Sequence, residues 1–198
     1  MAVTTASKAL TLEEFLKYPE TKPAISEFIA GEIIQKPGSK GRHSRLQGKL
    51  SNEINRVSEE QKIAYAFPEL RCSFGNRSLV PDIAVFRWDN IPFLDNGEVP
   101  DRFSLPPNWV IEILSPEQKP NQVIGNILYC IEKGSELGWF IDPDDHSILV
   151  FWRDARRAVA SRHRAPSLQQ ENDSLPLLSG IELELTVDQL FSWLKMGI

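Results

Sequence analysis

Two acidic residues stand inside apolar stretches of the chain and are its first candidates for chemistry. Asp82 occurs in LVPDIAVF, and Glu112 occurs in WVIEIL, which is typical of a strand buried on both faces. Burying a carboxylate is costly unless a cation or hydrogen-bond donors compensate for the lost hydration. Turn chemistry does not explain a charge in the middle of a strand, so Glu112 requires a partner.

The spacing of this pair favours a metal ion as that partner. Thirty residues separate Asp82 from Glu112, enough for the two strands to lie side by side with both carboxylates near one end of a sheet. Paired carboxylate oxygens suit Mg²⁺ or Mn²⁺, and such an ion would polarise a phosphoryl oxygen and acidify a water molecule. Two alternatives stay open: Asp82 caps a turn after Pro81, and Glu112 pairs with a buried arginine such as Arg71.

Helices are predicted at four places along the chain. A capping box from Thr11 to Glu14 opens a short one, and Thr186 caps the last one. Apolar residues from Leu46 to Val57 recur at spacings of four, four and three, which indicates a longer amphipathic helix. The helices are expected over 12–18, 43–60, 121–133 and from 187 onward.

Strands are predicted between these helices. Two β-rich pieces around Ala30-Gly31 indicate a hairpin over 25–34, and residues 63–74 alternate up to a turn at Gly75-Asn76. Further strands are expected over 79–86, 109–114, 137–141 and 148–152, and a long polar connection over 154–174. This order predicts an α/β fold with a mixed central sheet flanked by helices.

Composition bounds the class of protein. The 198 residues fit one domain, residues 1–198, with 41% hydrophobic and 25% charged residues. Cys72 and Cys130 lack the spacing of a zinc site or a disulfide framework, and no apolar run is long enough to span a bilayer. We therefore expect a cytoplasmic protein with reduced thiols and no membrane contact.

The charge pattern argues against a protein that coats nucleic acid. The net charge is −5, although two groups of cations stand out. One spans 36–49 and the other spans 153–164. Either group could contact phosphates, and a solvated surface is the commoner explanation for such runs.

Several segments together resemble a known family. They are VPDIAVF, WVIEILSP with its following helix and GWFIDP, ISEFIAGEII, His43 before the first long helix, and LTVDQLF near the C-terminus. In this combination the chain resembles the Uma-two family of restriction endonucleases, which belongs to the PD-(D/E)XK nuclease superfamily. The resemblance runs nearly end to end and implies a restriction-endonuclease-like core preceded by an N-terminal helix and β-hairpin.

The same resemblance assigns roles to individual residues. It implies that Asp82 and Glu112 bind a divalent ion, Mg²⁺ or Mn²⁺, with help from the main-chain carbonyl of Ile113. Glu27 matches an acidic position near that site, with a surface hairpin glutamate as the alternative. His43 either approaches a phosphate or serves the entry of the helix.

The chain departs from the superfamily at its lysine. That lysine normally stands two residues after the glutamate, where this chain has Leu114, and relatives that bring it from the next helix would place it at Asn126. Lys119 is the nearest cation that follows Glu112, and we expect it to assist catalysis if a lysine is used.

Three hypotheses follow from these residues. The first is a metal-dependent endonuclease that hydrolyses phosphodiester bonds in DNA through Asp82, Glu112, Lys119 and Glu27. The second is a nuclease fold without catalysis that binds nucleic acid or a protein partner, motivated by Leu114 and Asn126. The third is a structural protein in which Glu112 is a paired buried charge. A homodimer is expected by analogy with enzymes of this fold.

Overall fold

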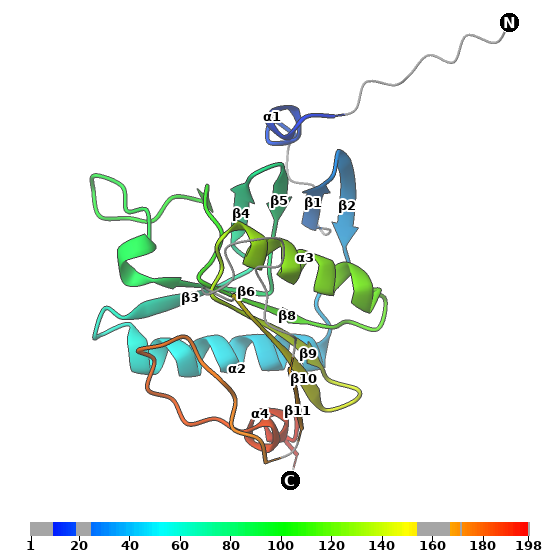
Figure 1. Cartoon of the computed structure of the whole chain (residues 1–198), viewed down its shortest axis with the longest axis vertical. Helices are drawn as coiled ribbons and strands as arrows, with labels where there is room; N and C mark the ends of the chain where they lie inside the picture. Colours follow the sequence, from blue (N-terminus) through cyan, green and yellow to red (C-terminus); the bar gives the residue numbers. More distant parts are fainter. Residues whose placement is uncertain (1–9, 19–24, 154–166, 171, 198) are drawn as a thin grey trace, which may run out of the picture.

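A computed structural model describes residues 10–18, 25–153, 167–170 and 172–197, and its core is a six-stranded mixed sheet (Figure 1). The strand order is β11-β10-β9-β8-β6-β3, in which only β8 and β9 are parallel. The strands are β3 (Ala64–Pro68), β6 (Ile83–Arg87), β8 (Trp109–Ile113), β9 (Leu137–Asp142), β10 (Ser147–Trp152) and β11 (Ser167–Gln170).

A second sheet of five strands lies beside the first. Its order is β2-β1-β5-β4-β7, and it contains the N-terminal hairpin. Its strands are β1 (Ile25–Ile29), β2 (Glu32–Lys36), β4 (Arg71–Phe74), β5 (Arg77–Leu79) and β7 (Arg102–Phe103). The hairpin turns at Ala30 and Gly31, both with positive φ, the geometry that two-residue hairpin loops require.

Helices α2 (Gly41–Ser58) and α3 (Pro120–Lys133) cover opposite faces of the six-stranded sheet (Figure 1). Apolar side chains of α2 pack with Trp109, Ile111 and Ile113 of β8. Those of α3 pack with Val110 of the same strand. Because strand residues alternate between faces, Glu112 lies on the α3 face of β8. A carboxylate therefore stands where an aliphatic core residue would be expected.

Short helices complete the fold: α1 (Leu12–Phe15), the 3₁₀ helix η1 (Trp88–Asn90) and α4 (Val187–Ser192). The predicted caps at Thr11 and Thr186 are both present as capping boxes, and Gly134 ends α3 as expected. No helix in the described part of the chain is long and apolar enough to cross a membrane.

Three predictions of secondary structure are wrong. The alternating stretch expected over 63–74 is two strands, β3 and β4, which belong to different sheets. The single strand expected over 79–86 is two strands, β5 and β6, separated by Val80, Pro81 and Asp82. The proline has no N–H to contribute to a ladder, and the chain changes from one sheet to the other there. The polar connection expected over 154–174 contains strand β11; residues 154–166, which hold most of the second group of cations, lie outside the described part.

The contact between α3 and β9 predicts a sharp difference between two glycines. A Cβ on Gly138 of β9 would clash with Cγ2 of Ile127, whereas nothing lies within 4 Å of a Cβ on Gly125 of α3. We expect Gly138→Ala to lower the free energy of unfolding by about 1–3 kcal/mol through overpacking. Gly125→Ala should leave it unchanged or raise it by up to about 1 kcal/mol. Chemical denaturation of both variants measures this, and equal effects would contradict the close packing.

Candidate active site

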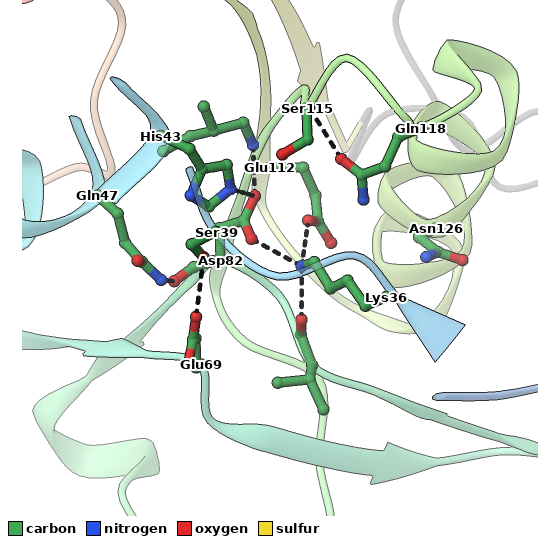
Figure 2. A network of polar contacts seen from close by, with 12 residues as sticks. Lys36, Ser39, His43, Gln47, Glu69, Asp82, Glu112, Ser115, Gln118 and Asn126 are labelled. Carbon is green, nitrogen blue, oxygen red and sulfur yellow. Dashed lines mark hydrogen bonds and ion pairs between the residues drawn. The ribbon is translucent and has the colours of Figure 1, made fainter. Parts of the chain in front are cut away.

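Asp82 is held in place by contacts from four directions (Figure 2). The main-chain N–H of Ile113 donates to its Oδ2 at 2.6 Å, and His43 Nε2 lies 3.0 Å from the same oxygen. Lys36 Nζ lies 2.7 Å from Oδ1, while the Gln47 side chain donates to the Asp82 carbonyl at 2.8 Å. Asp82 is 1% exposed, so its carboxylate depends on these groups instead of water.

The break between β5 and β6 positions this carboxylate. The N–H of Val80 donates to Oε1 of Glu27 at 2.8 Å, and the carbonyl of Val80 accepts from Lys36 Nζ at 2.8 Å. Both main-chain groups of Val80 are thereby satisfied by side chains, and Pro81 has no N–H to satisfy. Asp82 then enters β6 beside β8, which places its side chain near that of Glu112 as the sequence predicts.

Lys36 is the central cation of the site; the sequence indicated it only as the first of the cations over 36–49 and did not indicate a partner for Glu112. It is the last residue of β2 and is buried, with its Nζ 3.0 Å from Oε2 of Glu112, 2.7 Å from Oδ1 of Asp82 and 2.8 Å from the Val80 carbonyl oxygen (Figure 2). Three acceptors match the three N–H donors of an ammonium group. The partner of Glu112 is therefore this lysine, while Arg71, the predicted alternative, donates to the Ser26 carbonyl and the Ser78 hydroxyl.

The two carboxylates differ in their affinity for protons. Burial raises the pKa of Glu112 to about 8, because lost hydration and the charges of Asp82 and Glu27 outweigh the attraction of Lys36. Burial also opposes ionisation of Asp82, but the charge of Lys36 and the hydrogen bond from His43 prevail and lower its pKa to about 2. Burial disfavours the charged form of Lys36 as well, and the neighbouring carboxylates raise its pKa above the usual range. Asp82 therefore stays ionised over the ordinary pH range, whereas Glu112 can gain or lose its proton within that range.

Glu27, predicted to be near the site, does lie beside it. It is 5% exposed, its Oε1 accepts from Val80, and the Asn126 amide lies 3.4 Å from its Oε2. Burial raises its pKa, against the attraction of Lys36. In the register of the hairpin, Glu27 and Lys36 are on the same face, because Glu27 pairs with Ile34 and Ile25 pairs with Lys36.

The other predicted lysine lies elsewhere. Lys119 is the exposed N-cap residue of α3 and, within the described part of the chain, forms no ion pair with Asp82 or Glu112. Leu114 is half-buried against the apolar cluster under α3. Asn126, the position on α3 at which the resemblance led us to look for a lysine, faces Glu27. Here the cation comes from the end of hairpin strand β2 instead of from β8 or α3, where the sequence pattern places it.

The donor set fits a hydrated divalent ion. Asp82 and Glu112 each direct one oxygen to within 3.0 Å of a single cationic nitrogen, so their oxygens converge on one point. Within the described residues, no group of three or more His, Cys, Asp or Glu side chains is arranged so that it could hold a metal ion, so the protein ligands would be the two carboxylates. Two carboxylates without a cage suit Mg²⁺ or Mn²⁺, which keep several waters, and do not suit a structural zinc ion.

The fold is that of a restriction-endonuclease-like protein. The chain belongs to the Uma2 family, described as "Putative restriction endonuclease", whose model matches residues 12–188. It is also similar to a solved structure from Anabaena variabilis titled as a "putative nuclease belonging to DUF820". The two chains share 45% identity, the match covers 94% of this chain and 99% of that one, and the TM-score is 0.87. No curated protein matches the chain. The predicted family and α/β fold class are confirmed.

The raised pKa of Glu112 predicts that the metal-free protein loses stability as the pH rises. The unfolded chain ionises this residue near 4.5, whereas the folded protein keeps the proton up to about 8. Unfolding therefore releases a proton between these values, and the free energy of unfolding falls as the pH increases through that window. Urea denaturation in EDTA, at pH values from about 5 to 8, should show a smaller decrease for Glu112→Gln than for the wild type. Parallel curves for the two proteins would contradict the raised pKa.

Proposed function

We propose that this protein is a divalent-metal-dependent nuclease that hydrolyses phosphodiester bonds in DNA. The observation that carries the proposal is the convergence on one cation position of two buried carboxylates, Asp82 directly before β6 and Glu112 on the neighbouring strand β8. Membership of a family described as restriction endonucleases supports phosphodiester hydrolysis as the chemistry.

Asp82 and Glu112 would hold the ion, Mg²⁺ or Mn²⁺, with the main-chain carbonyl of Ile113 as a third oxygen. An ion bound there supplies polarisation of a phosphoryl oxygen and a water of lowered pKa. The chain contributes rigidity: Asp82 is fixed through Oδ2 by Ile113 and His43, so its Oδ1 keeps one direction. A ligand held in this way needs little rearrangement when the reaction proceeds.

Lys36 is the residue that we assign to the catalytic lysine of the superfamily. Its ammonium group is already within hydrogen-bond distance of both carboxylates, and it would stabilise charge that develops on the phosphate. Glu27 acts as a positioning residue in this scheme, because it fixes Val80, whose carbonyl anchors Lys36. Lys119 is the rival for the lysine role from the sequence.

Exposed cations near the site support a nucleic-acid substrate. His43, which contacts Asp82, stands in the first turn of α2, next to Arg42 and near the N-cap residue Lys40. The side chains of Lys40 and Arg42 are 52% and 54% exposed and pair with Glu117 and Asp144. Exposed ion pairs of this kind are weak, so phosphates of a bound strand can replace the carboxylates. DNA is the substrate we propose for this surface.

Removal of either carboxylate should abolish cleavage. We expect Asp82→Asn and Glu112→Gln to reduce nicking of supercoiled plasmid in Mn²⁺ or Mg²⁺ by at least about a thousandfold, since both oxygens hold the ion that acts on the phosphate. Asp101→Asn, at an exposed residue of the same charge, is the matched control. Wild-type nicking that both site variants retain would overturn the proposed function. Salt-sensitive DNA binding without nicking would favour the non-catalytic binding module instead.

The two lysine candidates are separated by one pair of variants. Lys36→Met should reduce nicking by at least about a hundredfold, because the nearest positive charge to the reacting phosphate is lost. Lys119→Met should stay within about twofold of the wild type, because its side chain is exposed at the start of α3. The reverse ranking would assign the catalytic lysine to Lys119, as the sequence pattern predicted.

A further inference from the structure

We infer that Lys36 competes with the divalent ion for its own binding site. Its ammonium group holds Asp82 and Glu112 together when no ion is present, and it gives up at least one of these carboxylates when the ion binds. The inference rests on the proposed function, because it takes Asp82 and Glu112 as the metal ligands.

The first support is that the ammonium group has no spare donor. Its three acceptors are the carbonyl oxygen of Val80, Oε2 of Glu112 and Oδ1 of Asp82, all within 3.0 Å. An ammonium group has three N–H donors and no acceptor. Lys36 therefore cannot contact a phosphate or a water in this arrangement without releasing one of the three.

The second support is that Asp82 has only one oxygen to offer. Its Oδ2 accepts from the N–H of Ile113 at 2.6 Å and faces His43 at 3.0 Å. Oδ1 is left for an ion, and Oδ1 is the oxygen that Lys36 holds at 2.7 Å. An ion held by Asp82 would have to bind through Oδ1, so the ion and the ammonium group compete for the same oxygen of the carboxylate.

The third support is the charge of the buried cluster. Glu27, Asp82 and Glu112 are each no more than 5% exposed and lie around a single lysine. With Lys36 removed and no ion present, ionising more than one of these side chains would cost more free energy, because their burial and mutual repulsion would no longer be offset by a cation. Lys36 thus supplies, when no ion is bound, the positive charge that a bound ion would supply to these side chains.

Displacement gives Lys36 a defined second position. Val80 is a main-chain anchor that does not bind the ion, so the ammonium group can keep that hydrogen bond while it leaves a carboxylate. The released N–H then becomes available to an oxygen of the substrate phosphate. In this scheme, binding of the ion switches Lys36 from a structural cation to a substrate contact.

The test is the affinity for Mn²⁺, measured by isothermal titration calorimetry on the whole chain. We expect Lys36→Met and Lys36→Gln to bind Mn²⁺ at least about tenfold more tightly than the wild type, because the competing charge is gone. Lys195→Met, the control at an exposed lysine outside the candidate site, should bind like the wild type. Without metal, both Lys36 variants should melt at a lower temperature than the wild type, and Mn²⁺ should raise their melting temperature by more.

The outcomes separate this inference from the proposed function. Wild-type binding of Mn²⁺ with equal or weaker binding by both Lys36 variants would overturn the competition and leave the nuclease assignment intact. Tight binding of Mn²⁺ by a Lys36 variant, together with no detectable binding by the wild type, would support the competition. No binding and no nicking by any of the proteins would overturn both. If a Lys36 variant folds only with Mn²⁺, its metal-dependent melting transition replaces the titration and supports the competition.

Discussion

A single ammonium nitrogen, that of Lys36, joins the parts of this molecule that carry its chemistry. It binds the end of the N-terminal hairpin to the Val80-Asp82 connection and to β8, and so ties the five-stranded sheet to the six-stranded one. Buried ion pairs contribute little net free energy to folding, because desolvation offsets much of their attraction. Apolar residues in these places would pack as well. The arrangement is therefore better explained by what the carboxylates do than by what they contribute to folding.

The surrounding structure restricts motion at the carboxylates more than at the lysine. Asp82 is fixed by main-chain and α2 contacts, and Glu112 projects from a strand whose five residues are all buried. Lys36 ends an edge strand of the smaller sheet, where the chain leaves toward α2. A rigid pair of anions facing a cation on a long flexible side chain is suited to exchange of the cation. This contrast is the physical basis of the competition inferred for Lys36.

The sequence was sufficient for the carboxylates and insufficient for their partner. Asp82 and Glu112 are visible because each interrupts an apolar run, and hydrophobic periodicity located both long helices within two residues at each end. Lys36 precedes Pro37-Gly38, a composition typical of a loop, and a lysine there is usually exposed. Its burial depends on the second sheet, whose short strands β5 and β7 pair over distances that local patterns do not encode. Extending the predicted hairpin two residues beyond Ile34 would have paired Lys36 with Ile25 and so placed it on the same face as Glu27. This register was the one signal in the sequence that could have indicated Lys36.

The short connection between β2 and α2 has a consequence for how such proteins are recognised. Lys36 and His43, which bracket it, both contact Asp82, so one stretch of chain delivers the positive side of the site and the sheet delivers the negative side. Electrostatics requires a cation at a point in space and sets no condition on the order of residues along the chain. The lysine can therefore come from different helices or strands in different proteins, while the arrangement of charges at the site stays the same. A search pattern that demands lysine beside the glutamate would then pass over chains whose site is complete in three dimensions.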